Sequence, residues 1–215
     1  MKAVVSSTLA RAMHEDLVMR NIMRLAELPA RERQATTPWT AAEARAFLEA
    51  ARGITLYPAF ALLLFYGLRC AEVLGLRWRD VDEEDAELRI RQQLHCAHGK
   101  LSPVKCAHGR RRDLPLLGSA AEILETRRTA QAADRLEHRR AWQDNGLVLT
   151  TKTGQPIEPR RLALSLRLIC DIRGLRPIKL HHLRHTTAML LNDMKVPAGD
   201  IQLILGSCGT PGSTA

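Results

Sequence analysis

The chain has 215 residues, enough for one full domain and a remainder, and 46% of them are hydrophobic but only 4% aromatic. This composition predicts an aliphatic, largely helical core. The formal net charge of +9 favours a polyanionic partner, although a soluble basic protein without one is the alternative. No apolar run reaches the roughly 18 residues that cross a bilayer. Five cysteines at irregular positions, without a secretory leader, indicate the reducing cytoplasm.

The first part of the chain predicts one helix followed by a linker. Apolar residues recur at helical spacing over residues 4–28. The polar, charged segment between Pro29 and Pro38 then marks a domain boundary. The predicted helix belongs either to a separate domain or to a free-standing segment that packs on the main domain.

Two helices are predicted directly after this linker. Thr40 followed by Glu43 is a capping-box pattern, which predicts a helix that runs to about Ala51. A strongly apolar helix follows from Tyr57, and Gly67 ends it because glycine lets the chain turn. The core should therefore be built around the second helix.

A strand-like region follows, with three short candidates at residues 87–91, 101–105 and 111–116. The same region carries a small repeat, CAHGK at residues 96–100 and CAHGR at residues 106–110. Two Cys-x-His pairs could ligate zinc, but the spacing differs from that of a zinc knuckle. We therefore expect two turns and no metal.

The second half of the chain predicts further helices. Residues 119–143 form a long one, with many arginines on its outer side, and residues 147–150 form a strand-like run. Residues 159–173 form another helix. Its Arg160 and Arg161 are either contacts to a nucleic acid backbone or exposed charge.

The sequence HHLRH at residues 181–185 precedes an apolar pattern that predicts a helix. His181 and Arg184 are three residues apart and so face the same way on a helical turn. An arginine fork beside a titratable imidazole suits a phosphate and a proton transfer. A solvated basic helix start is the alternative.

A second arginine motif lies upstream, where residues 65–82 read FYGLRCAEVLGLRWRDVD. This segment resembles the first arginine box of the tyrosine recombinases, the phage-integrase family. The family pattern is Gly-[Leu/Met]-Arg, an acidic residue three positions on, then Leu-x-Trp-x-Asp. The HxLRH pattern of residues 181–185 matches the family's second box.

The resemblance implies an α+β, mainly α fold, which is the DNA breaking-rejoining catalytic core with a small three-stranded antiparallel sheet. It assigns residues 1–30 to a remnant of the last helix of a SAM-like core-binding domain. Residues 31–38 are then the linker, and residues 39–215 are the integrase catalytic domain without its C-terminal end.

The resemblance also implies a metal-independent chemistry without a cofactor. Arg69 and Arg184 would hold the scissile phosphate as a preorganised clamp. Lys105 would protonate the leaving 5′ oxygen, and His181 would assist as base or hydrogen-bond donor. Lys100 is the alternative to Lys105, because the hairpin loop is one residue longer than in the family pattern.

The expected partner is double-stranded DNA, on which members of the family assemble as tetramers. Basic side chains outside the catalytic set would contact DNA. These are Arg110, Arg111, Arg160, Arg161 and His185.

The nucleophilic tyrosine of the family has no counterpart in the sequence. Family members continue from the second box to Leu-Gly-His and place the tyrosine about nine residues later, whereas Ser207 follows Gly206 here. We expect that the coding frame was lost after Gly206, and a natural variant with a remodelled tail is the alternative. The sequence thus predicts an inactive integrase of a mobile element, or a DNA-binding fragment that interferes with an intact recombinase.

Overall fold

The computed structural model describes residues 2–25, 37–94, 101–104 and 112–206, without the side chains of residues 2–4 and 24. The chain divides into two compact units, Met1–Ala35 and Thr36–Ala215. This division falls within the segment that the sequence predicts as linker. Among the described residues, no helix is both long and apolar enough to cross a membrane.

The smaller unit contains helix α1 (Lys2–His14) and the 3-10 helix η1 (Ile22–Arg24). The prediction of one helix over residues 4–28 is therefore wrong for residues 15–25, and residues 26–28 lie outside the described part of the chain. The helix ends because Asp16 adopts a positive φ of 53°, a conformation that Asp tolerates better than most residues. Asn21 then caps η1 by accepting from the Met23 N–H.

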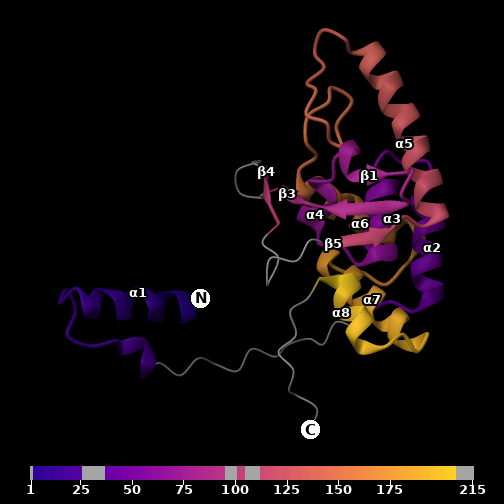
Figure 1. Ribbon diagram of the computed structural model, residues 1–215. Coiled ribbons are helices and arrows are strands. Elements are labelled where there is room, and N and C mark those ends of the chain that lie inside the picture. The colour runs from indigo at the N-terminus through magenta and orange to yellow at the C-terminus, as the bar shows by residue number, and fades with distance from the viewer. Residues whose placement is uncertain (1, 26–36, 95–100, 105–111, 207–215) are drawn as a thin grey trace. The chain divides into compact units, whose positions relative to one another are not determined.

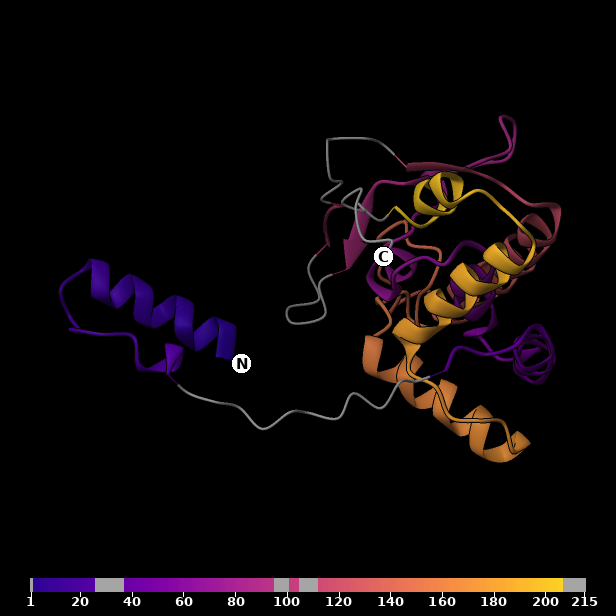
Figure 2. The ribbon, with the colours of Figure 1, turned by 90° about the horizontal axis from the view of Figure 1, so that it is seen from below.

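The larger unit is mostly helical (Figures 1 and 2). Its helices are α2 (Ala41–Ala51), α3 (Tyr57–Tyr66), α4 (Cys70–Leu74), the 3-10 helix η2 (Trp78–Asp80), α5 (Gly118–Glu137), α6 (Pro159–Arg173), α7 (Leu180–Asp193) and α8 (Ala198–Leu205). Figure 2 shows α7 running between α6 and α8. Helix α3 contacts α2, α4, α5 and α7 and forms the centre of the unit.

Two small antiparallel sheets lie beside these helices. One has the order β1-β2-β5, with β1 at Val81–Asp82, β2 at Glu87–Ile90 and β5 at Arg112–Pro115. The other pairs β3 (Gln92–Leu94) with β4 (Leu101–Pro103). A three-stranded antiparallel sheet is thus confirmed, but its third strand is β1. The candidate at residues 101–105 pairs with β3 instead.

The core is aliphatic, as the composition predicts, and α3 is buried on nearly every side. Helix α2 packs its Phe47 between Trp39 and Phe60, with ring centroids 5.1 and 5.0 Å apart. The predicted capping box of α2 is present, since Thr40 and Glu43 each accept from the other's backbone N–H. The start of the larger unit is therefore fixed to α3 through aromatic packing.

The predicted helix at residues 119–143 ends earlier, at Glu137, where α5 gives way to a turned segment. Its Leu136 is 62% exposed, whereas Arg127, one of the arginines predicted on the outer side, is buried. This reversal has a physical reason, because the buried face of α5 packs against backbone that needs hydrogen-bond donors. Residues 147–150, which the sequence predicts as strand-like, form only isolated bridges.

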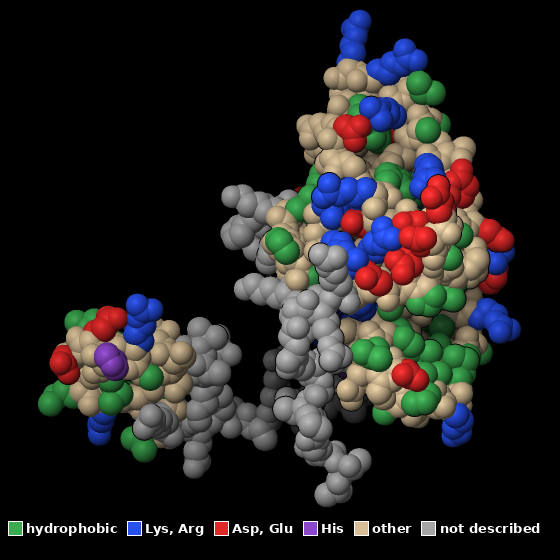
Figure 3. All heavy atoms as spheres, viewed as in Figure 1, with side chains coloured by type: hydrophobic (Ala, Val, Ile, Leu, Met, Phe, Trp, Pro, Cys, Tyr) green, Lys and Arg blue, Asp and Glu red, His purple; other side chains and the backbone are tan. Residues whose placement is uncertain are grey.

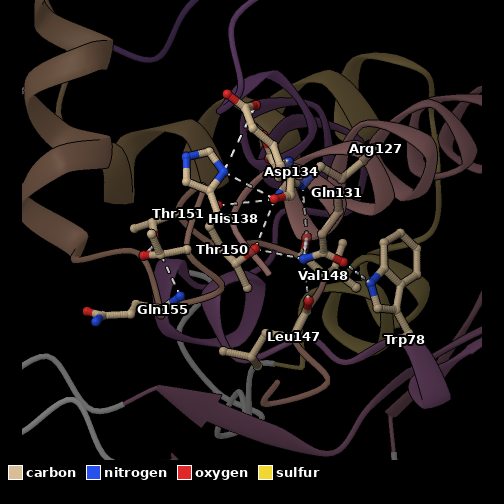
Figure 4. A network of polar contacts seen from close by, with 12 residues as sticks. Trp78, Arg127, Gln131, Asp134, His138, Leu147, Val148, Thr150, Thr151 and Gln155 are labelled. Atoms are coloured by element: carbon tan, nitrogen blue, oxygen red, sulfur yellow. Dashed lines mark hydrogen bonds and ion pairs between the residues drawn. The ribbon is translucent and has the colours of Figure 1, made fainter. Parts of the chain in front are cut away.

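Arg127 and Gln131 of α5 supply these donors (Figure 4). The Arg127 guanidinium donates to the carbonyl oxygens of Val148 and Thr150, both at 3.1 Å. The Gln131 amide donates to the Thr150 hydroxyl oxygen at 2.7 Å, and its own oxygen accepts from the Trp78 indole at 2.6 Å. The network fixes the segment before α6 to the side of α5.

Candidate active site

The site begins at the turn between α3 and α4. Gly67 ends α3 in the left-handed conformation, with φ of 57°. A Cβ at this position would collide with the Leu205 side chain and press on Thr187, so glycine is required for both conformation and space. The turn brings Arg69 to the start of α4 and leaves the Gly67 carbonyl oxygen free of the helix.

Arg69 is the N-cap residue of α4 and its side chain is 47% exposed. Its backbone N–H donates to Glu72 Oε2 at 2.9 Å, and its Nη1 donates to Glu72 Oε1 at 2.7 Å. The Glu72 side chain is only 1% exposed. The buried carboxylate of Glu72 therefore holds one edge of the Arg69 guanidinium. The rest of the guanidinium faces solvent.

Arg184 reaches the same turn from α7. Its Nη1 donates to the Gly67 carbonyl oxygen at 2.8 Å, although 117 residues separate the two positions. Burial, together with the nearby positive charges of Arg69 and Arg112, lowers the pKa of Arg184 to about 10. The side chain still carries its charge at neutral pH.

Arg112, at the start of β5, completes the cluster from a third direction. Its Nη1 donates to Glu72 Oε2 at 3.0 Å, and its Nη2 donates to the carbonyl oxygens of Tyr66 and Ile204. No motif in the sequence gave this residue a role. It follows Arg110 and Arg111 in the predicted hairpin, and this run of arginines is the signal that could have found it.

The C-terminal end of α8 closes the site. Gly206 ends this helix with a φ of 60°, and its carbonyl oxygen accepts from Arg69 Nη2 at 3.3 Å. Guanidinium groups near the carbonyl end of a helix are favoured by its dipole. The ends of α3 and α8 therefore both turn their carbonyl groups toward the arginine cluster.

The charges of the cluster do not balance. Among the described residues, the guanidiniums of Arg69, Arg112 and Arg184 lie with one carboxylate, that of Glu72, which leaves an excess of positive charge. Preorganised guanidiniums with spare donors bind phosphate well, because the fork geometry matches its oxygens. The cluster therefore has the charge and the donors that the binding of an anion requires.

His181 lies on the first turn of α7, one turn before Arg184, and is exposed. Its ring contacts that of His182 edge-on, with centroids 3.8 Å apart and the ring planes at 60°. Burial lowers the pKa of both histidines below its ordinary value, and the neighbouring His185 and Lys179 add to the effect. Both imidazoles are therefore neutral at pH 7, when each can accept a proton. His182 and His185 also line a pocket of about 390 Å³ beside α7.

The structure brings some predicted site residues together. Arg69 and Arg184 meet in the cluster, and His181 and His185 share α7 with Arg184. Arg160 and Arg161 are exposed on the first turn of α6. The remaining predicted residues lie outside the described part of the chain. They are Lys100, Lys105, Arg110 and Arg111, and the Cys-x-His repeat lies there with them.

The face shown in Figure 3 has a mixed charge over the larger sheet. Arg89 on β2 forms ion pairs with Asp82, Asp85 and Glu87, and Arg91 pairs with Asp113. These arginines are neutralised locally. The cluster at the ends of α3 and α8 differs from these arginines, because its positive charge is in excess.

Comparison with known proteins identifies the fold. The fold is the catalytic-domain fold of the tyrosine recombinases. The Tn1549 transposon integrase in complex with a circular intermediate DNA superposes with a TM-score of 0.77 over 97% of this chain and 70% of that chain, at 18% identity. The lambda integrase tetramer bound to a Holliday junction gives 0.67 over 98% and 56%, at 16% identity.

Sequence comparison defines the family. A profile of the phage integrase family matches residues 39–207. A XerC-like tyrosine recombinase of Caldanaerobacter subterraneus subsp. tengcongensis is 27% identical over 76% of this chain and 45% of its own length. An integrase of Streptomyces ambofaciens is 28% identical over 93% and 54%. The chain belongs to the phage integrase family. It spans about half the length of these relatives.

Proposed function

We propose that the larger unit binds double-stranded DNA by its backbone and clamps one phosphate between Arg69 and Arg184. The observation that carries this proposal is the meeting of both guanidiniums at the turn from Gly67 to Glu72, with positive charge in excess. DNA integration and recombination are the processes of the family, and the related structures named above are DNA complexes. A location in the cytoplasm would suit this function.

The proposed chemistry is transesterification at phosphorus without a metal. Negative charge builds on the non-bridging oxygens as the phosphorane forms, and two fixed guanidiniums stabilise it without reorganisation. His181, neutral at pH 7, would accept a proton from the attacking hydroxyl or donate a hydrogen bond. Lys105 would protonate the leaving 5′ oxygen. Arg160, Arg161 and His185, which are exposed, would contact flanking phosphates, with Arg110 and Arg111 from the hairpin.

The sequence has no tyrosine at the position where the family pattern places the nucleophile. Its two tyrosines are Tyr57 and Tyr66, both on α3. Tyr66 is 3% exposed and its hydroxyl accepts from the Leu117 N–H at 2.9 Å, so it is a core residue. We propose that this polypeptide binds DNA but does not form the phosphotyrosine link itself. A tetramer on DNA, as in the lambda integrase complex, is part of the same proposal.

Two measurements test the proposal. Fluorescence anisotropy measures binding to a duplex of mixed sequence over a salt series. The slope of the logarithm of the binding constant against the logarithm of the salt concentration should fall in magnitude by about one when Arg69 or Arg184 is changed to Met. Unchanged affinity and slope in both variants would refute the phosphate clamp. A nicked duplex then separates enzyme from binder. The binder leaves no covalent adduct on a denaturing gel, whereas an adduct would show that a residue of this sequence attacks phosphorus.

A further inference from the structure

Arg112 differs from the other two arginines of the cluster because it is almost wholly inside the protein. Its side chain is 7% exposed, against 47% for Arg69. A guanidinium this deeply buried has little surface with which to reach a DNA backbone. Its role must therefore be sought in the groups that it joins.

Arg112 joins three helices. Its donors reach Glu72 on α4, the Tyr66 carbonyl at the end of α3, and the Ile204 carbonyl near the end of α8. The contacts lie 40, 46 and 92 residues away in the sequence. One planar fork can satisfy such a divergent set of acceptors, whereas a lysine ammonium is a point charge and cannot do so in the same geometry.

The contact with Glu72 is the one that matters for Arg69. Oxygen Oε2 of Glu72 accepts both from Arg112 and from the Arg69 backbone N–H, while Oε1 accepts from Arg69 Nη1. A carboxylate that is 1% exposed needs a charged partner, because an unpaired buried charge is costly. Without Arg112, Glu72 would draw Arg69 further inward or turn away from it, and in either case the Arg69 fork would leave its present direction.

The end of α8 depends on the same side chain. A Cβ built at Gly206 would lie 3.0 Å from Arg112 Cδ and 3.2 Å from its Nε. The Gly206 carbonyl oxygen in turn accepts from Arg69. Arg112 and Arg69 therefore both contact the last turn of α8, and a displacement of one side chain would shift the other.

We propose that Arg112 is a positioning residue of the phosphate site. It fixes Glu72 and the C-terminal turn of α8 so that Arg69 presents its exposed edge to a phosphate, and it does not touch the phosphate itself. This inference rests on the proposed phosphate clamp. It adds that a residue of the sheet, on β5, helps to orient the clamp, together with the helices that carry its two arginines.

The decisive experiment is a double-mutant cycle in DNA binding with the full chain. Duplex of mixed sequence is titrated over a salt series with the unchanged protein, Arg69→Met, Arg112→Met and the double variant. If Arg112 acts through Arg69, each single variant should weaken binding about tenfold. Each should also lower the salt slope by about one, and the double variant should be no weaker than Arg69→Met. Arg112→Lys should fail to restore the slope.

Arg127→Met is the matched control. Arg127 is likewise a buried arginine that donates to backbone carbonyls, but it lies on α5 in the network around Thr150. Its loss should lower the melting temperature and leave the salt slope unchanged. A drop in stability alone therefore cannot produce the expected result for Arg112.

If Arg112→Met does not fold, a second pair of variants tests the contact between Arg112 and the last turn of α8. Gly206→Ala places a methyl group against Arg112, whereas Gly174→Ala imposes a similar backbone strain, at φ of 62°, with nothing within 4 Å. Only Gly206→Ala should reduce the Arg69-dependent part of DNA binding.

Three outcomes would overturn the inference. The first is an additive effect of the Arg69 and Arg112 variants, and the second is an unchanged salt slope in Arg112→Met with Arg69→Met affected. The third is equal behaviour of the two glycine variants. If Arg69→Met and Arg184→Met both leave binding unchanged, the phosphate clamp itself fails and the inference falls with it.

Discussion

Arg184 donates to the carbonyl oxygen of Gly67 at 2.8 Å, across 117 residues of sequence. This contact joins the second arginine motif to the turn that presents the first. Gly67 can offer its carbonyl because it ends α3 in the left-handed conformation. The relative position of Arg69 and Arg184 is therefore decided by the packing of α7 on α3, and a change in that packing would alter the proposed clamp.

Changing Arg184 to Met should separate binding from stability. Arg184 lies near two other guanidiniums, which together with burial lower its pKa to about 10. Removing the guanidinium relieves this repulsion and offsets the lost hydrogen bond to Gly67. We expect the free energy of unfolding to change by less than about 1 kcal/mol, while DNA affinity falls about tenfold.

Urea unfolding and fluorescence anisotropy measure these two quantities in the same preparation. Arg167→Met is a suitable control, because Arg167 is an exposed residue of α6 that pairs only loosely with Asp171 at 3.7 Å. A large loss of stability in Arg184→Met would contradict the picture of a repulsive site.

Glu43 should give the protein a measurable acid sensitivity. The Arg176 guanidinium and the Thr40 backbone N–H lower the pKa of Glu43 from 4.5 to about 2. Because the folded pKa is the lower one, this stabilisation is complete above pH 4.5 and is lost as the pH falls toward 2. Glu43→Gln should therefore be less stable than the unchanged protein at pH 7 and equal to it near pH 2.

Thermal unfolding across this pH range tests the prediction. Glutamine can keep the capping box with Thr40, so the difference isolates the ion pair with Arg176. Glu49→Gln is the matched control on the same helix, since Glu49 is exposed and pairs only with Arg52. A constant difference between Glu43→Gln and the unchanged protein at every pH would be inconsistent with the lowered pKa.

The histidines of α7 should make the protein less stable in mild acid. Burial lowers the pKa of His181 and His182 in the folded state. The unfolded chain then binds more protons near pH 6.5, so the free energy of unfolding falls as the pH drops through this value. A variant with both histidines changed to Gln should show a weaker dependence between pH 7.5 and the folded pKa.

Chemical unfolding at closely spaced pH values provides this test. His138→Gln is the comparison, because His138 lies on the far side of the unit at the end of α5. The prediction is wrong if the double variant and the unchanged protein follow parallel curves.

Thr150 should matter more than its neighbour Thr151. The Thr150 hydroxyl oxygen accepts from Gln131 at 2.7 Å and from Arg127 at 3.1 Å, and the residue is 1% exposed. Thr150→Val keeps the shape of the side chain but removes this acceptor from two buried donors. We expect a loss of about 1.5 kcal/mol in the free energy of unfolding, because each donor keeps a backbone partner.

The partly exposed Thr151 provides the control, since its hydroxyl bonds only to Thr153 and the Gln155 N–H. Thr151→Val should cost about 0.5 kcal/mol or less. Urea unfolding compares the two variants, and equal losses would show that the network in Figure 4 contributes little.

Much of the larger unit could be predicted from local patterns. The capping box at Thr40 and Glu43 marks the start of α2, and Gly67 marks the end of α3. These features depend on neighbours within one helical turn, so a short window contains their cause. Helix α6 agrees with its predicted range of residues 159–173 for the same reason.

Most of the wrong predictions concern features that residues far apart in the sequence decide. The sequence counted Arg127 among outward-facing arginines, but the backbone of Val148 and Thr150 draws it into the interior. It placed residues 101–105 in the three-stranded sheet, but partner choice in a sheet is a long-range property, and β4 pairs with β3. The predicted helix over residues 4–28 is an exception, because a local turn at Asp16 ends it at His14.

The sequence alone determined the two arginine motifs, the family that they indicate, and the side chains able to hold a phosphate. Only the tertiary structure decided that Arg112 joins Glu72, the end of α3 and the end of α8 behind those arginines. The physical reason is that a motif records residue types at short spacing. The direction of a guanidinium is set by buried acceptors, and here these come from helices and strands far apart in the chain.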